Sequence, residues 1–246
     1  MTYCVGLKLD RGLVFMSDTR TNAGVDNISV FKKMFLWERA GERSVTLMTA
    51  GNLATTQAVI SLLNERAKPA DERGHPSMLD APSMFQVAKL VGETLREVIA
   101  EQSGISGPQA DSPFSATLIL GGQVRGGEPR LFMIYPEGNF VEASTDTPYM
   151  QIGETKYGKP ILVRAYNPAM SFEEAVKLLM LSFDSTVKAN LSVGLPLDLH
   201  LYPADTFETG ILRRIERDDP FYEMISSGWG EALRAAFDGL PAYSLD

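Results

Sequence analysis

The order of strand-like and helix-like stretches constrains the fold of this chain more than any other feature. Residues 3–9 alternate between two faces, and an apolar run over residues 12–18 follows a glycine turn, which predicts an N-terminal β-hairpin. Further strand patterns cover residues 30–38, 44–50, 115–122, 130–136 and 196–203. Helical patterns cover residues 53–68, 82–102 and 171–190, with a last short helical region at 219–237. Because strands and helices come in separate blocks, the order predicts an α+β fold.

Length and composition favour one domain. The chain has 246 residues, and its 44% hydrophobic content is enough for a large core. No internal repeat is visible, and the two glycine-rich stretches at residues 104–113 and 121–129 are short enough to be loops. We therefore expect a single domain over residues 1–246.

Charge and cysteine content exclude several classes of function. With 31 acidic and 23 basic residues, the formal net charge is −8, which argues against nucleic acid and anionic membrane surfaces as partners. No stretch has the length and apolarity of a transmembrane helix or the pattern of a signal peptide, so we expect a cytoplasmic protein. We expect the single cysteine, Cys4, to be a small buried strand residue. His75 and His200 lack neighbours at ligand spacing, and no metal or cofactor is expected.

The second residue is a candidate nucleophile. An initiator methionine is normally removed before a small residue, and this processing would leave Thr2 with a free α-amine and a hydroxyl. The usual pKa of an α-amine, near 8, suits proton transfer close to neutral pH. Thr2 would therefore carry both a nucleophile and its general base.

The turn of the first hairpin sets what lies beside Thr2. A three-residue loop at residues 10–12 predicts that Cys4 faces Asp18 and that Thr2 faces Arg20. All four residues would then share one face of the sheet, whereas a two-residue turn would move Asp18 to the other face. The expectation thus depends on the loop length.

A lysine pair in the strand pattern of residues 30–38 supplies a candidate cation. Alternation through this run puts Lys32 and Lys33 on opposite faces, so one of them must point among apolar neighbours. Burial lowers the pKa of a lysine and a nearby carboxylate raises it again, which makes a pair between Asp18 and Lys33 chemically reasonable.

These motifs together resemble a known family. Thr2, "SDTR", "FKKM" and "MTAGN" come in the same order and at nearly the same spacing as the Thr, Asp, Lys and Gly motifs of proteasome β-type subunits and the bacterial peptidase HslV. The start of the chain, with a C-terminal extension from about residue 217, looks most like the Anbu group of bacterial proteasome-related proteins, the ancestral β subunits. The resemblance implies the four-layer αββα sandwich of N-terminal nucleophile hydrolases.

The resemblance also implies roles for individual residues. Thr2 would be the nucleophile and, through its α-amine, the general base, while Asp18 and Lys33 would orient and activate it. Gly51 matches the glycine whose N–H faces the developing oxyanion, and Asn22 falls where family members bind the substrate main chain as an added strand. The implied reaction is acyl transfer to Thr2 followed by hydrolysis, as in a threonine peptidase or amidase.

The implied assembly is a large homo-oligomer, in the Anbu group an open ring or a helix. Peptides or unfolded proteins are the implied substrates, and a separate ATPase would have to unfold stable proteins because the chain has no Walker motif.

Two departures from the family pattern motivate other functions. Glu154 stands where relatives have a serine near the active site, and "KANLSVG", with Asn190 and Ser192, replaces their Asp-x-x-Ser-Gly pattern. A structural or binding assembly that hydrolyses little or nothing is therefore an alternative. A cytoplasmic amidase acting on a small amide or isopeptide is a third.

Overall fold

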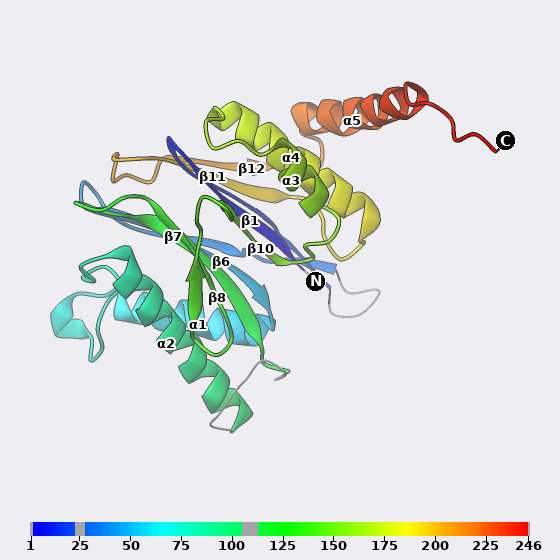
Figure 1. Cartoon of the computed structure of the whole chain (residues 1–246). Helices are drawn as coiled ribbons and strands as arrows, with labels where there is room; N and C mark the ends of the chain where they lie inside the picture. Colours follow the sequence, from blue (N-terminus) through cyan, green and yellow to red (C-terminus); the bar gives the residue numbers. More distant parts are fainter. Residues whose placement is uncertain (1, 23–27, 105–112, 246) are drawn as a thin grey trace.

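Two five-stranded antiparallel sheets form the centre of the molecule (Figure 1). The computed structural model describes residues 2–22, 28–104 and 113–245. The first sheet has the order β10-β1-β2-β11-β12, with bounds Tyr149–Gly153, Tyr3–Leu9, Gly12–Asp18, Leu197–Pro203 and Ile211–Ile215. The second sheet has the order β5-β6-β7-β8-β9, with bounds Met34–Arg39, Arg43–Gly51, Ala116–Val124, Arg130–Ile134 and Phe140–Glu142. A two-stranded pair joins β3 (Arg20–Asn22) and β4 (Ile28–Val30).

Helices cover the outer face of each sheet, which confirms the four-layer αββα sandwich. Helices α1 (Leu53–Arg66) and α2 (Met84–Ser103) pack on the second sheet, and α3 (Lys159–Ala165) and α4 (Phe172–Ala189) pack on the first. A single 3₁₀ turn, η1 (Ala70–Glu72), lies between α1 and α2. Helix α5 (Pro220–Asp238) follows β12 and runs away from the body of the molecule (Figure 1).

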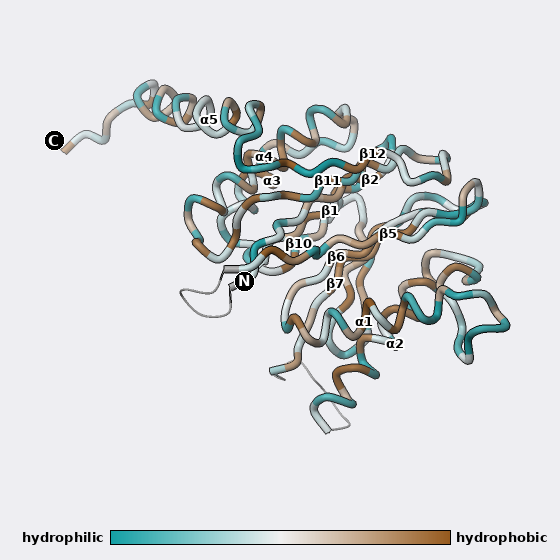
Figure 2. The backbone as a smooth tube through the Cα atoms, turned by 180° about the vertical axis from the view of Figure 1, so that it is seen from behind, coloured by the Kyte–Doolittle hydropathy of each residue, from teal (hydrophilic) through white to brown (hydrophobic). Residues whose placement is uncertain are grey.

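The apolar side chains form a cluster at each interface between layers. Residues of β1 and β2 alternate between two of them: Val5 and Met16 pack with α4, whereas Cys4 and Phe15 pack between the sheets. Figure 2 shows the apolar stretches of the second sheet gathered where it meets the first sheet and its helices. Because successive residues of the N-terminal strands point to opposite faces, these strands contribute side chains to two layers of the core.

The helix boundaries follow their caps. Ser83 caps α2 by accepting the N–H of Gln86, and Ser171 forms with Glu174 the capping box of α4. The C-terminal helix coincides with the helical region expected at residues 219–237. It spans 19 residues, and its cap Asp219 accepts the N–H of Tyr222 at 2.9 Å.

The first hairpin corrects the predicted register. Leu9 pairs directly with Gly12, so the turn has two residues instead of three, and Cys4 lies opposite Ser17. The expected pairing of Cys4 with Asp18, and with it Thr2 opposite Arg20, is wrong. A shift of one residue changes the face of every side chain, and Asp18 therefore does not share the face of Cys4.

The strand pattern over residues 30–38 is also interrupted. Strand β4 ends at Val30 and β5 begins at Met34, and the three residues between them belong to neither strand. The N–H of Phe31 donates to Thr19 O at 2.8 Å, and the N–H of Thr49 donates to Lys33 O at 3.0 Å. These bonds hold the connection against β2 and β6, which brings Lys33 to the end of β2.

Candidate active site

Thr2 lies immediately before β1 and is held by the end of β10. Its carbonyl oxygen accepts the N–H of Glu154 at 2.6 Å. Gly153 has φ +83°, and a Cβ atom at this position would lie 1.9 Å from Thr2 O. Only glycine allows these two backbone segments to approach this closely, so the backbone of residues 153–154 fixes Thr2 at the mouth of a cleft.

A buried ion pair lies beside this end of β1. Lys33 Nζ donates to Asp18 Oδ1 at 2.7 Å and to Arg20 O at 2.5 Å, and Asp18 Oδ1 also accepts the N–H of Tyr3 at 3.0 Å. Asp18 is 0% exposed and Lys33 is 4% exposed. Burial raises the pKa of the Asp18 carboxyl, while the Lys33 ammonium and the Tyr3 N–H act in the opposite direction. The other lysine, Lys32, is exposed and lies over the Phe35 ring.

A cleft of about 520 Å³ joins Thr2 to the lysine. Its lining includes Thr2, Thr21, Lys33, Thr49, Gly51 and Gly153. The first turn of α1 also reaches the cleft through Leu53 and Thr56. The positive end of that helix dipole therefore adds to the charge of Lys33 on this wall.

Gly51 ends β6 at the edge of the cleft. Its φ is +118°, and a Cβ atom would lie 2.5 Å from Ser115 O, so the position requires glycine. The next residue, Asn52, caps α1 by accepting the N–H of Thr55. The glycine of the "TAGN" motif thus lies where a strand edge passes into a helix N-terminus.

The structure singles out Thr21 on the strand that was expected to bind substrate. Asn22 is the last residue of β3 and pairs with Ile28, and its side chain falls outside the described part of the chain. Thr21 lines the cleft. Successive strand residues point to opposite faces, and this alternation was the signal that could have identified Thr21.

Glu154 and Asn190 form a second polar group next to Thr2. The Glu154 carboxylate is buried and accepts Asn190 Nδ2 at 3.0 Å, and Asn190 Oδ1 accepts the N–H of Ser192 at 2.9 Å. Residues 36 positions apart in the chain are therefore joined beside the nucleophile candidate.

The cysteine and the two histidines lie outside the cleft that contains Thr2. Cys4 is buried between the sheets, and burial raises the pKa of its thiol. His200 is a satisfied core histidine, with Nδ1 at 2.8 Å from Thr46 Oγ1 and Nε2 at 2.5 Å from Thr209 O. Burial lowers the pKa of His200 to about 4, so its ring is neutral near pH 7. His75 is exposed in the α1–α2 connection.

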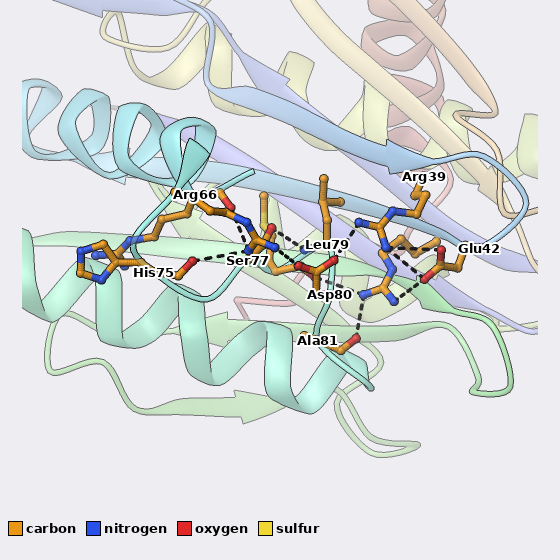
Figure 3. A network of polar contacts seen from close by, with 11 residues as sticks. Arg39, Glu42, Arg66, His75, Ser77, Leu79, Asp80 and Ala81 are labelled. Carbon is orange, nitrogen blue, oxygen red and sulfur yellow. Dashed lines mark hydrogen bonds and ion pairs between the residues drawn. The ribbon is translucent and has the colours of Figure 1, made fainter. Parts of the chain in front are cut away.

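A larger hollow, about 630 Å³, lies on the outer side of the molecule between this connection and α2. Charged side chains brace its wall (Figure 3): Arg39 Nη2 donates to Asp80 Oδ1 at 2.8 Å, and Arg43 Nη1 donates to Ala81 O at 2.7 Å. Arg73 donates to the same Asp80. This network fixes a long loop, and its charges are already paired with one another.

The described ranges contain neither a metal cluster nor a membrane-spanning helix. No group of three or more His, Cys, Asp or Glu residues is arranged around a metal position in residues 2–22, 28–104 and 113–245. Over the same residues, no helix combines the length and apolarity that crossing a membrane requires.

Comparisons with known proteins agree with the fold. The profile of the family "Proteasome subunit" matches residues 2–194. A proteasome subunit beta from Haloquadratum walsbyi is 26% identical over 227 residues, which cover 91% of this chain and 80% of that protein.

Solved structures of high similarity extend over nearly the whole chain. Anbu (ancestral beta-subunit) from Yersinia bercovieri is 48% identical, with a TM-score of 0.91 over 99% of this chain and 100% of that one. The Anbu complex from Pseudomonas aeruginosa, solved as a helical assembly, is 44% identical, with a TM-score of 0.90 over 99% of each chain. The match therefore includes the residues after position 194, which the family profile does not reach. This chain belongs to the proteasome subunit family and, within it, to the Anbu ancestral β subunits.

Proposed function

We propose that this protein is a threonine-type amide hydrolase that uses Thr2 as its N-terminal nucleophile. One observation carries the proposal: Thr2 and the buried Lys33–Asp18 pair line or adjoin one cleft, at the edge of which lies a glycine that cannot carry a side chain. The proposal requires the removal of Met1, because only then does Thr2 have a free α-amine to act as a base.

The acylation step transfers the acyl group of the substrate to Thr2. The Thr2 hydroxyl oxygen attacks the amide carbonyl carbon, and its proton passes to the α-amine. The backbone N–H of Gly51 stabilises the resulting oxyanion. When the C–N bond breaks, the leaving amine takes the proton from the α-ammonium, and an ester on Thr2 remains.

Hydrolysis of the ester regenerates the enzyme. The free α-amine accepts a proton from water, whose oxygen attacks the ester carbonyl, and the carboxylic acid leaves as Thr2 regains its hydroxyl proton. Lys33 lowers the cost of negative charge on the Thr2 oxygen in both steps, and Asp18 keeps Lys33 charged and fixed.

The proposed substrate is an extended peptide or an unfolded protein. Thr21, in β3, and Gly51, at the end of β6, both line the cleft, so a peptide that lies between them could bind by main-chain hydrogen bonds. Stable folded proteins would need a separate unfolding ATPase.

Self-association of this chain is part of the proposal. Large apolar side chains stand exposed along α5 and the residues after it: Phe221, Met224, Leu233, Phe237, Leu240, Tyr243 and Leu245. Such a concentration of exposed apolar surface is typical of an interface between proteins. The relative from Pseudomonas aeruginosa forms a helical assembly, and we infer an open-ring or helical homo-oligomer here.

A specific observation also favours the alternative of a weakly hydrolytic or non-hydrolytic binding assembly. The polar group next to Thr2 contains a buried carboxylate, Glu154, bonded to the neutral amide of Asn190. A negative charge at this place would hold the α-amine protonated and thus weaken it as a base.

A peptide-hydrolysis assay distinguishes these functions. The processed chain should cleave members of a fluorogenic peptide library, Thr2→Ser should retain part of this activity, and Thr2→Ala should have none. Cleavage of small amides or isopeptides without cleavage of peptides would favour the narrower amidase. If the processed chain and Thr2→Ala both fail to cleave any substrate, the binding assembly is the better account.

A further inference from the structure

Glu154 is a buried acid without a cationic partner among the described residues. The residue is 8% exposed, and its carboxylate accepts two neutral donors, Asn190 Nδ2 at 3.0 Å and the N–H of Lys156 at 3.5 Å. Throughout the described part of the chain, no lysine, arginine or histidine forms an ion pair with it. A carboxylate removed from water is normally paired with a positive charge, and the described surroundings of Glu154 do not supply one.

The backbone keeps Glu154 against Thr2. Tyr3 pairs with Gly153 at the end of the β1–β10 ladder, and the next pair in this register is Thr2 with Glu154. The N–H of Glu154 donates to Thr2 O at 2.6 Å across this pair. Directly opposed residues of antiparallel strands have Cβ atoms about 5 Å apart, which brings the carboxylate within reach of the Thr2 main chain.

Processing of the N-terminus would create a cation at this place. Removal of Met1 converts the Thr2 amide nitrogen into an α-ammonium group, on the same residue whose carbonyl oxygen accepts the N–H of Glu154. We propose that the Thr2 α-ammonium is the cation that pairs with the Glu154 carboxylate, and that this pair positions the amine and holds it in its charged form. The inference rests on the proposed role of the Thr2 amine, and it assigns Glu154 as a positioning residue with Asn190 as its orienting donor.

Other charged groups around the amine are balanced differently. Lys33, from the β4–β5 connection, and Asp18, from the end of β2, neutralise each other through their 2.7 Å contact. Lys32 lines the same cleft from its exposed side, and Arg20 lies on β3. Glu154 is the acidic group that the end of β10 brings to Thr2, so its removal should change the charge of the amine directly.

The pair would control the pH at which the enzyme becomes active. An opposite charge nearby should raise the pKa of the α-amine by about one unit from its usual value near 8. At pH 7 the uncharged amine would then be about tenfold scarcer than without the carboxylate. Weak hydrolysis at neutral pH and stronger hydrolysis in alkaline solution would follow from one residue.

The test measures the pKa of the amine itself, which needs no catalysis. Chains that begin at Thr2, verified by intact mass, are acetylated briefly with acetic anhydride over a range of pH, and the modified N-terminal peptide is quantified by mass spectrometry. Glu154→Gln preserves the size of the side chain and should lower the apparent pKa of the α-amine by about one unit. Glu154→Asp keeps the charge and should retain most of the shift, and Glu101→Gln, an exposed change on α2 with the same loss of charge, should have no effect.

The outcomes separate this inference from the proposed function. A lowered pKa in Glu154→Gln supports the pair even if no variant cleaves peptides, in which case the proposed function alone fails. An unchanged pKa in Glu154→Gln overturns the pair, even in an active enzyme. Among active variants, Glu154→Gln should cleave peptide about tenfold faster at pH 7 and equally fast above the pKa of both amines.

Discussion

Replacement of Lys33 by methionine would test the buried ion pair directly. Methionine fills nearly the same volume as lysine, so the change removes the charge and leaves the packing almost intact. In Lys33→Met, Asp18 remains at 0% exposure, keeps the N–H of Tyr3 at 3.0 Å and loses the ammonium group at 2.7 Å. The variant therefore leaves a buried carboxylate without its positive partner.

The expected loss of stability is large. Removing one partner of a buried ion pair typically costs about 3–5 kcal/mol, because the remaining charge is desolvated and uncompensated. Removing both partners avoids this cost, so Asp18→Asn combined with Lys33→Met should recover at least about 2 kcal/mol of the free energy of unfolding.

The pH dependence of the loss has a defined sign. Burial already raises the pKa of the Asp18 carboxyl, and Lys33→Met removes the positive charge that opposes that shift. A carboxyl whose native pKa lies above its unfolded value contributes stability below the unfolded pKa and loses it as the pH rises through the native pKa. The penalty of Lys33→Met should therefore be greatest near pH 7 and decrease toward pH 4.

Two assays on the same variants separate stability from catalysis. Urea unfolding at a fixed protein concentration should give the order wild type, double variant and Lys33→Met, from most to least stable. Modification of Thr2 by a β-lactone should be lost in both variants, including the stable double variant. A Lys33→Met protein as stable as the wild type, or a double variant that reacts at the wild-type rate, would refute the reasoning.

Three further predictions concern the core, the cleft and the C-terminal helix. Burial lowers the pKa of His200 to about 4, so its neutral ring stabilises the fold above pH 6.5, and this stability is lost as the pH falls. In urea unfolding between pH 8 and pH 5, the wild type should therefore lose about 2 kcal/mol more of its free energy of unfolding than His200→Gln. Gly51→Ala should cost about 2 kcal/mol in the same assay and slow the modification of Thr2, because its Cβ would lie 2.5 Å from a backbone oxygen. Phe237→Glu, at a side chain 78% exposed on α5, should reduce the mass of the assembly in analytical ultracentrifugation without loss of helix content.

Matched variants decide each of these cases. Equal pH slopes for wild type and His200→Gln would contradict the neutral buried ring. Gly228→Ala, in an open part of α5, should stabilise by about 0.5–1 kcal/mol, and an equal gain from Gly51→Ala would contradict the strain at the cleft. Arg234→Gln makes the same change in net charge as Phe237→Glu, so an equal loss of assembly in both would argue against an apolar interface.

Local signals in the sequence identified the four long helices and most strands of the two sheets, but not β9, β10, β12 or α3. The capping box of Ser171 and Glu174 marks the start of α4, and the alternation of residues 3–9 marks β1. Both signals act within a few residues and do not depend on distant parts of the chain. The layer arrangement came from the resemblance, since block order alone leads only to an α+β fold.

Features that depend on contacts between distant parts of the chain could not be predicted from local sequence patterns. "DRG" is compatible with a two-residue or a three-residue hairpin turn, and the choice determines the face on which Asp18 lies. The strand pattern expected over residues 30–38 gave no sign of the break at residues 31–33, where no strand forms. The structure nevertheless brings Lys33 to Asp18, because the connection is hydrogen-bonded to Thr19 and Thr49.

The polar group around Glu154 shows why site details are the hardest to predict. Its hydrogen bond to Asn190 joins a strand end to a helix end 36 residues away, and no local pattern relates the two. The approach of Gly153 to Thr2 O likewise depends on the register of two strands that are distant in sequence. Contacts of this kind become visible only when both elements are placed in one fold.

Intact-protein mass spectrometry tests the central claim most directly. The purified chain is measured with and without a threonine-directed epoxyketone, beside Thr2→Ala and the exposed control Thr145→Ala. We predict loss of Met1 and a single adduct on the wild type and on Thr145→Ala, and no adduct on Thr2→Ala. A chain that has lost Met1 and still forms no adduct, or an adduct that persists in Thr2→Ala, would contradict the assignment of Thr2 as the nucleophile.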